Sequence, residues 1–297
     1  MADVAQNALG TPPGKQRQRR VSSDSGWSIL RWIMIIIGMT IVLVPFLWLV
    51  TTSFKPESAY LAYPPRFIPD NWTLEGYRIL FQKEQLGRFF LNSLVITLTS
   101  TVLSVAFGSI AAYSLARAKL PFRLNNIIAF WMLLTRMYPA IATAIPYFLL
   151  IRELNLLDTR WALIITHTAF NLPFVIWLMI GFYQELPKEL ERAAMVDGCS
   201  AWQRFTKIVL PLSAPALVAT SILAAILSWN EFLFAVMLTR NEAKTLPVVM
   251  SGFITDKGLL WNQMTALGVI TVLPVLLFAI AVQKYLVRGL TLGAVKE

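Results

Sequence analysis

Three consecutive residues near the end of a long apolar stretch have side chains that suit the recognition of a hydroxyl-rich ligand. Trp229 offers an aromatic face for stacking, Asn230 an amide, and Glu231 a carboxylate that accepts hydrogen bonds. Sugars are bound by this combination of stacking and hydrogen bonding. A structural ion pair, or a charge near the membrane interface, is the alternative interpretation of Glu231, and the sequence leaves both open.

Four further polar candidates lie within apolar stretches. Arg136 is the only charged residue between positions 124 and 151, and Tyr138 follows two positions later. Because a charge inside an apolar span is costly and marks a functional site by default, both are candidates for lining a translocation path. His167 and Asn171 are one helical turn apart and share a face, where a hydrogen bond between packed helices is the alternative to a ligand contact.

Enzymatic chemistry has little support in the sequence. A membrane-embedded enzyme needs convergent acid, base or metal ligands, and the chain has one His and one Cys, Cys199. A single cysteine excludes an intrachain disulfide and a cysteine-based zinc cluster. Because so few suitable ligands and acid–base groups are present, we expect neither a catalytic residue nor a metal site on this chain. The segment 10–16 (GTPPGKQ) lacks the spacing and the final Ser or Thr of a phosphate-binding loop. Energy must therefore come from a partner or from an ion gradient.

The elements that must position these residues are long apolar helices. The chain has 297 residues, 57% hydrophobic and 14% charged, against about 45–50% and about 25% in soluble domains. Four charge-free stretches, and two with a single charge, each exceed the roughly 20 residues that an apolar helix needs to cross a bilayer. We predict an all-α integral membrane protein with six transmembrane helices, over about 30–54, 89–116, 124–151, 160–184, 208–239 and 260–284.

The distribution of positive charge predicts the orientation. With both termini inside the cell, 15 of the 26 Lys and Arg residues fall on the inner side and ten on the outer side. Since inner loops are enriched in Lys and Arg, both termini are predicted to be cytoplasmic. The net charge of +10 then reflects orientation and contact with the lipid bilayer rather than nucleic-acid binding.

The same topology predicts the domain organisation. The polar, basic segment 1–28 is expected to be a flexible cytoplasmic tail. A transmembrane domain follows over 29–290 and contains a cytoplasmic loop over 185–207. A short cytoplasmic C-terminal tail is expected over 291–297.

Small residues at four-residue spacing predict close packing of two of the spans. This packing is either within the chain or against a second membrane subunit. The two rows are Ser104, Gly108 and Ala112, and Ala216, Thr220, Ala224 and Ser228.

The cytoplasmic loop has the pattern of two short helices joined by a turn. KELERAAMV after Pro187 consists of good helix formers. Asp197-Gly198 indicates a stop and a turn. Ser200 with Gln203 three residues later is a capping box, which starts the second helix.

The first of these helices is too short to form a core of its own. Leu190, Ala193 and Ala194 fall on one face, and this face must pack against the membrane bundle or against a separate protein. A simple connector beside the membrane is the alternative interpretation.

The loop resembles the cytoplasmic loop of permease subunits of ABC importers, whose consensus is Glu-Ala-Ala, three residues, Gly, nine residues and Ile-x-Leu-Pro. The match has one departure, because Arg192 stands where the consensus has Glu, and Glu191 stands one position earlier. The residues that the resemblance assigns to coupling are Glu191, Arg192, Ala193, Ala194, Asp197, Gly198, Ile208, Leu210 and Pro211.

The resemblance extends over most of the chain, to the carbohydrate permeases of the maltose-transporter type and to the smaller of their two membrane subunits. It includes TSFKP at 52–56, the NWTLEGY segment, SWNEF at 228–232 and the closing GLTLGAVKE. The family implies a heterodimer with a second permease, an extracytoplasmic sugar-binding protein and two copies of a cytoplasmic ATPase. No cofactor is expected on this chain, and ATP and Mg would be bound by the ATPase.

The resemblance also implies the function and the location. We expect a subunit of an ATP-driven importer in the plasma membrane of a bacterium or archaeon, specific for a di- or oligosaccharide such as maltose or trehalose. The helix from Glu191 to Gly198 would lie in a groove of the ATPase and move with it as the nucleotide site closes. An ABC permease for a non-sugar solute and an ion-coupled secondary transporter are the alternatives.

Overall fold

The computed structural model describes residues 25–294, apart from 61, 83–84, 119 and 257. The chain divides into two units, Met1–Leu47 and Trp48–Glu297. The first unit is described by most of α1 (Ser25–Ser53), whose end from Trp48 onward belongs to the second unit. Helix α1 begins inside the segment 1–28 that was predicted to be a flexible tail, and the remainder of that segment lies outside the described residues.

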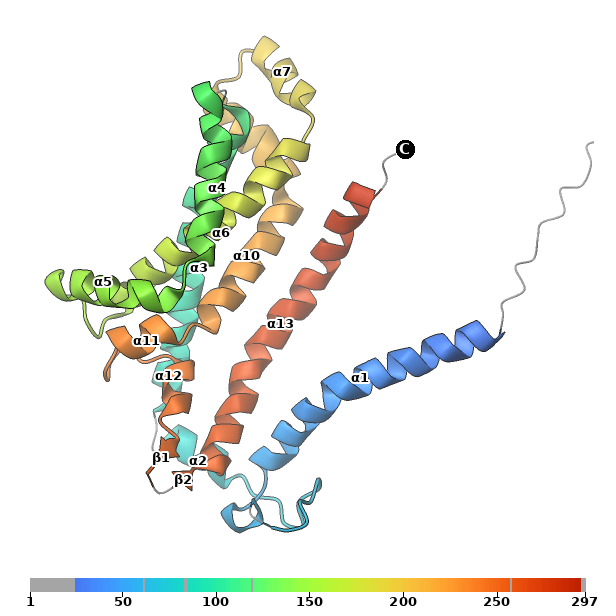
Figure 1. The fold of residues 1–297 in the computed structure, drawn as a ribbon, viewed down its shortest axis with the longest axis vertical. Helices are drawn as coiled ribbons and strands as arrows, with labels where there is room; N and C mark the ends of the chain where they lie inside the picture. The colour runs from blue at the N-terminus through green and yellow to red at the C-terminus, as the bar shows by residue number, and fades with distance from the viewer. Residues whose placement is uncertain (1–24, 61, 83–84, 119, 257, 295–297) are drawn as a thin grey trace, which may run out of the picture. The chain divides into compact units, whose positions relative to one another are not determined.

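The described part of the second unit is mostly helical (Figure 1). Helix α7 lies at one end of the unit, and α2 and the hairpin of β1 and β2 lie at the other. The hairpin is antiparallel, with Ile254 opposite Leu259. The elements are η1 (Glu57–Ala59), α2 (Glu75–Gln82), α3 (Leu86–Arg117), η2 (Pro121–Arg123), α4 (Leu124–Met137), α5 (Ala140–Glu153), α6 (Arg160–Glu185), α7 (Lys188–Val196), α8 (Ala201–Arg204), the π-helical turn η3 (Phe205–Val209), α9 (Leu210–Leu212), α10 (Ala214–Trp229), α11 (Leu233–Leu238), α12 (Leu246–Ser251), β1 (Ile254–Thr255), β2 (Gly258–Leu259) and α13 (Trp261–Ala294).

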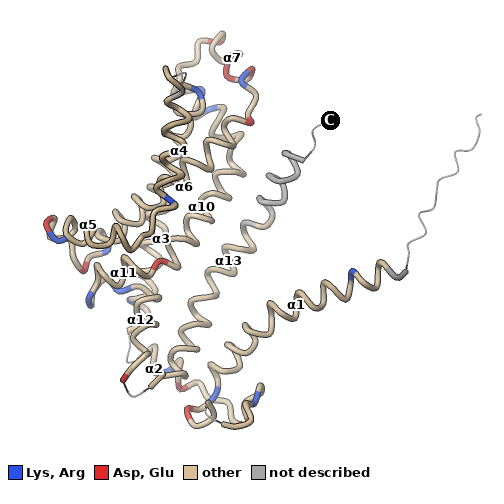
Figure 2. Tube along the Cα trace, in the orientation of Figure 1, with Lys and Arg blue, Asp and Glu red and all other residues tan. Residues whose placement is uncertain are grey.

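Four described helices are long and apolar enough to cross a membrane, and up to six spans result if each of two bent helix pairs counts as one. This confirms the predicted all-α membrane class. The predicted count of six spans is reached only if each bent pair is counted as one span. The four helices are Trp27–Ser53, Leu86–Arg117, Arg160–Glu185 and Trp261–Ala281. Charged residues of the second unit lie mostly near the ends of its helices, with long uncharged stretches between them (Figure 2).

The predicted span over 124–151 is not one straight helix. It is divided into α4 and α5, which meet at an angle of 93°. The break falls at Tyr138 and Pro139, because proline has no N–H for the helical ladder and disfavours helical geometry in the residue before it.

The predicted span over 208–239 is also interrupted. The second helix of the loop over 185–207, which is predicted to be cytoplasmic and is named the inner loop, continues to Leu212. It meets α10 at 77°, beside Ser213, whose hydroxyl donates to the carbonyl of Val209 at 2.7 Å. At the far end, α10 stops at Trp229 and the separate helix α11 begins at Leu233.

The C-terminal boundary differs from the prediction as well. Helix α13 runs to Ala294, so most of the predicted tail over 291–297 continues the helix. The last three positions lie outside the described residues.

The core of the second unit is built on the close approach of α3 and α6. An added Cβ at Gly108 would lie 2.7 Å from Cγ1 of Val175, so only glycine fits there. Ser104 and Ala112 on the same row are fully buried. In the second row, Thr220 donates to the sulfur of Met179 at 3.5 Å. Both rows of small residues therefore pack within this chain.

Candidate coupling site

The inner loop has the predicted helix, turn and helix. Gly198 has φ of +80°, a left-handed conformation that favours glycine. The N–H groups of Gly198 and Cys199 donate to the carbonyls of Met195 and Ala194 at 3.1 and 2.9 Å, which closes the end of α7. The geometry fixes the angle at which the chain leaves this helix.

The predicted capping box at the start of α8 is confirmed. The N–H of Gln203 donates to Oγ of Ser200 at 3.2 Å, and the N–H of Ser200 donates to Oε1 of Gln203 at 2.8 Å. These two bonds satisfy backbone donors that the first turn of a helix leaves unpaired.

One face of α7 is fastened to the membrane bundle. Glu191 is only 7% exposed. Its Oε2 accepts a hydrogen bond from the hydroxyl of Tyr113 at 2.7 Å, and its Oε1 accepts one from Nε of Arg117 at 2.6 Å. Ala194, one turn of α7 further on, is 6% exposed and lies on the same side as Glu191.

The second helix of the loop is fastened to the same place through aromatic rings. Phe205 is buried, with its ring centre 5.0 Å from that of Tyr113 and 6.5 Å from that of Tyr183. Of the motif residues that follow, Ile208 and Leu210 are half-buried and Pro211 is exposed. The loop is therefore seated on α3 and α6 by both of its helices.

The side of α7 away from the bundle is exposed and carries both apolar and charged residues. Val196 is 89% exposed, Met195 55% and Leu190 45%. Leu190 and Ala193 thus point away from the bundle, whereas the sequence alone had grouped them with Ala194. Three exposed apolar side chains on a helix of nine residues favour contact with a partner.

The charged departure from the consensus lies on the exposed side as well. Arg192 makes an ion pair with Glu189 at 3.5 Å, and both side chains are more than 70% exposed. Asp197 is also exposed. The two charges next to each other in the motif therefore point in opposite directions, Glu191 inward and Arg192 outward.

His167 and Glu231 are brought together inside the bundle. Nδ1 of His167 is 2.7 Å from the hydroxyl of Ser228, and its Nε2 is 3.2 Å from Oε2 of Glu231. The carboxylate of Glu231 also accepts the N–H groups of Phe234 and Ala235, at 2.8 and 3.1 Å, and so caps α11. In this structure Glu231 caps α11 and ties it to α6.

Trp229 and Asn171 are parts of helix packing. Trp229 is 1% exposed, and its indole N–H donates to the carbonyl of Thr271 in α13 at 3.1 Å. Asn171 donates to the carbonyl of Ala224 at 3.4 Å. Neither side chain offers a free surface to a sugar in this conformation.

The other pathway candidates lie at the breaks between helices. Arg136 lies over the rings of Phe170 and Phe174, at 4.9 and 5.3 Å, and donates to the carbonyl of Phe170 at 3.2 Å. Tyr138 and Asn230 are exposed. The pathway candidates therefore do not converge on one site.

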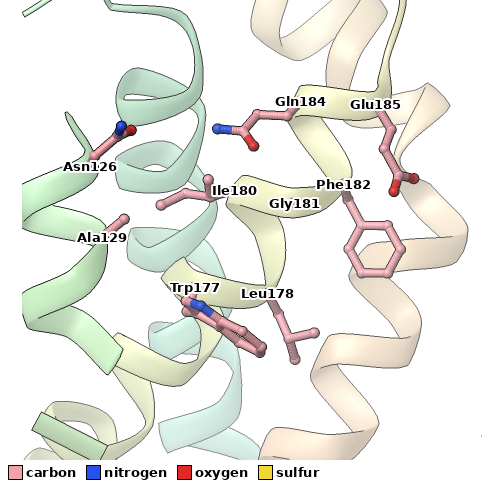
Figure 3. A pocket seen from close by; sticks show the side chains of 9 residues that line it. All are labelled: Asn126, Ala129, Trp177, Leu178, Ile180, Gly181, Phe182, Gln184 and Glu185. Carbon is pink, nitrogen blue, oxygen red and sulfur yellow. The ribbon is translucent and has the colours of Figure 1, made fainter. Parts of the chain in front are cut away.

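A groove that the sequence did not predict lies between α4 and α6, with a volume of about 550 Å³. Asn126 and Ala129 of α4 face Gln184 and Ile180 of α6 across it, and Trp177 lies at its far end (Figure 3). None of the pathway candidates lines it. Its walls are brought together by helix packing, which leaves no local pattern in the sequence.

Tyr113 and Arg117 are the contacts of the loop that sequence reasoning missed. They are one helical turn apart at the end of α3, and they are separated from Glu191 by 78 and 74 positions. The only local signal is a tyrosine and an arginine on one face where a span ends.

Long apolar helices with a polar loop seated on them by one face are the arrangement of a polytopic membrane protein. The family of binding-protein-dependent transport system inner membrane components matches residues 104–292. The chain belongs to this family and is an ABC transporter permease of the multi-pass membrane class.

Several relatives are similar over almost their entire length. The trehalose/maltose transport system permease protein MalG of Thermococcus litoralis is 36% identical over 276 residues, which are 90% of this chain and 98% of the relative. The trehalose transport system permease protein SugB of Mycobacterium tuberculosis is 34% identical over 273 residues, 91% of this chain and 97% of the relative. These relatives confirm the predicted resemblance to carbohydrate permeases.

A solved structure has the same fold. A chain from the crystal structure of a bacterial ABC transporter involved in the import of the acidic polysaccharide alginate has a TM-score of 0.73 to this chain. The two are 26% identical, and the match covers 89% of this chain and 98% of that chain. The fold class inferred from hydropathy is confirmed by this similarity.

Proposed function

We propose that this chain forms half of the translocation pathway of an ATP-driven importer of a di- or oligosaccharide such as trehalose or maltose. The sugar class is supported by relatives named as permeases for trehalose, trehalose/maltose and diacetylchitobiose. The single observation that supports ATP coupling is α7, whose side with Glu191 and Ala194 is attached to the bundle while Leu190, Met195 and Val196 remain exposed.

The proposed complex contains a second permease, two copies of a cytoplasmic ATPase and an extracytoplasmic sugar-binding protein. The family description, a binding-protein-dependent transport system, supports the last of these partners. The chain itself is non-catalytic in this proposal, and ATP and Mg are bound by the ATPase. Both termini and α7 are cytoplasmic, as the excess of Lys and Arg on that side favours.

In the proposed mechanism, α7 transmits movement of the ATPase to the bundle. Arg192, Ala193 and the turn at Asp197-Gly198 contact the ATPase groove, and the exposed apolar side chains of α7 are buried on docking. The fixed exit angle at Gly198 prevents the movement from being lost in the turn. Ile208, Leu210 and Pro211 carry it into α10.

Among the pathway candidates, the exposed residues are best suited to contact sugar. Tyr138 and Asn230 present a ring and an amide at helix breaks, and Arg136 lies beside the first of these breaks. Trp229, His167, Asn171 and Glu231 act in this proposal by holding the helices.

The test is uptake by the reconstituted complex in proteoliposomes. The chain is combined with its second permease, ATPase and binding protein, and uptake of labelled trehalose and maltose is measured with ATP on the ATPase side. We expect uptake that falls to background when the ATPase or the binding protein is omitted. Uptake driven by an ion gradient without the ATPase would overturn the proposal, and import of labelled methionine in place of the sugars would contradict the sugar class.

A further inference from the structure

We propose that the Glu191 cluster, which consists of Glu191, Tyr113 and Arg117, is the connection through which α7 moves α3 and α6. The inference rests on the proposed function, because it names the contacts through which movement of the ATPase would pass from α7 to the membrane helices. Glu191 is then a positioning residue for coupling, and it does not contact the ATPase.

The first reason is that the cluster is shielded from water. The side chains of Arg117 and Glu191 are 14% and 9% exposed, with 2.6 Å between Nε and Oε1. Opposite charges attract more strongly where water is excluded, and removing one partner leaves the other charge buried without compensation. The pair therefore resists separation when α7 is displaced.

The second reason is that Arg117 joins three segments of the chain. It belongs to the last turn of α3, it donates to Glu191 of α7, and its Nη2 donates at 3.3 Å to the carbonyl of Leu186, which follows α6. A single planar guanidinium thus holds the end of α3, the end of α6 and α7 in one arrangement.

The third reason is the tight packing that follows along α3. Gly108 in the same helix meets Val175 of α6 so closely that no Cβ fits between them. Ser104, one turn earlier, donates to the carbonyl of Thr168 at 3.3 Å. Helices packed at this distance move together, because a close-packed interior transmits displacement with little compression.

The exposed ion pair of α7 differs from the buried pair of Glu191 and Arg117. Arg192 and Glu189 are 3.5 Å apart and exposed, and such pairs are weak in water. Consecutive residues of the motif therefore have different tasks, in which Glu191 holds α7 to the bundle and Arg192 lies on the exposed side, where the partner docks. This division explains why a positive charge is accepted at the second position of the motif.

The experiment uses the complete complex in proteoliposomes with labelled trehalose and maltose. The variants are Glu191→Gln, Arg117→Gln, and the exchange Glu191→Arg with Arg117→Glu. Three quantities are measured for each variant: the amount of ATPase that co-purifies, the rate of ATP hydrolysis, and sugar uptake per ATP hydrolysed. Arg66→Gln is the matched control, because Arg66 pairs with Asp70 on an exposed outer loop.

We expect both single variants to retain the ATPase and to hydrolyse ATP, while uptake per ATP falls about 5- to 150-fold, the usual range of coupling between two sites. The exchange variant should recover part of the uptake, which a loss of folding alone would not explain. Tyr113→Phe removes one hydroxyl and should give a smaller loss of the same kind. Arg66→Gln should behave as wild type.

The proposal is overturned if the single variants import sugar with the wild-type ratio of uptake to hydrolysis. It is also overturned if the ATPase no longer co-purifies with Glu191→Gln at normal membrane abundance, because Glu191 would then contact the partner. A wild-type complex that imports neither sugar in an ATP-dependent manner contradicts the proposed function itself, which separates the two failures.

Discussion

The two ends of the second unit are stabilised in different ways. At the end opposite α7, the carboxylate of Asp158 accepts the N–H groups of residues 240–243 at distances between 2.9 and 3.1 Å. Asn92 of α3 donates to the carbonyls of Glu242 and Lys244 at 2.8 and 3.0 Å. The backbone of this loop over 240–243, named the outer loop after its predicted position, is thus held by its own chain.

The inner loop is held by one face only. Glu191 and Phe205 attach it to α3 and α6, but Val196 and Met195 remain exposed. A loop whose backbone groups are satisfied by its own chain has a fixed position without a partner. The inner loop, in contrast, is stabilised by a partner that covers its exposed apolar side chains. Binding of a partner is therefore expected to increase the stability of the inner loop more than that of the outer loop.

The largest expected effect concerns the conformation of the inner turn. Gly198→Val should reduce sugar uptake to background at normal membrane abundance, because left-handed backbone costs about 1–2 kcal/mol for residues other than glycine. Gly198→Asn should retain most of the uptake, since asparagine tolerates this conformation. An added Cβ meets nothing within 4 Å, so the difference reports the backbone. Equal uptake by both variants would show that the turn angle is unimportant.

The exposed face of α7 gives the next largest effect. Val196→Asp should reduce co-purification of the ATPase about tenfold or more, because a charge would be buried at the docked surface. Ile254→Asp is the matched control at the outer hairpin, where Ile254 is 62% exposed. Quantitative immunoblots of the purified complex make the measurement. The contrast between the two ends is wrong if both substitutions have the same effect.

The fastening of the outer loop should be lost on neutralising one carboxylate. Asp158→Asn should lower the free energy of local opening of residues 240–243 by about 1–3 kcal/mol, since hydrogen bonds to a charged acceptor are among the stronger ones. Hydrogen exchange of these amides measures the change. Amides of α7 serve as the internal control, and an equal change there would mean that the variant is destabilised as a whole.

The same carboxylate predicts the response of the outer loop to acid. Burial by itself raises the pKa of Asp158, but the N–H donors of Arg240, Glu242, Ala243 and Asn241 outweigh it and hold the pKa below the usual 3.8. A folded-state pKa below the unfolded one stabilises the loop above pH 3.8, and this stabilisation is lost as pH falls through the lowered value. Protection should thus be constant from about pH 5 to 8 and fall only below the usual pKa, whereas Asp158→Asn should show no such transition.

The smallest effect is expected at the exposed charge of the motif. Arg192→Gln should leave the thermal stability of the isolated subunit in detergent within about 1 kcal/mol of wild type, because exposed ion pairs contribute little. Glu191→Gln, one residue away, should destabilise it measurably. Reversal of this order would contradict the assignment of the two side chains to opposite faces of α7.

Features set by neighbouring residues could be predicted from the sequence. The capping box at Ser200 and Gln203 and the left-handed turn at Gly198 depend on contacts within a few positions, and both are found. The long apolar helices follow from composition over one segment. The bend at Pro139 also had a local cause, but the long stretch with a single charge was interpreted as one span.

Features set by distant residues could not be predicted. The partners of Glu191 are more than 70 positions away, and the pairing of His167 with Glu231 spans 64 positions. Trp229 illustrates the same limit, because its side chain suits sugar stacking and yet lies buried against α13. Side-chain chemistry alone does not say which surface a residue will face.

The sequence by itself determined that this is a helical membrane protein with a helix–turn–helix at one end, since hydropathy and capping depend on residues near one another in the chain. Only the tertiary structure decided which face of that helix is attached and which is open. The physical reason is that burial of a charge requires a partner of opposite sign within reach. Arg117 meets that requirement for Glu191 only after α3, α6 and α7 have packed together.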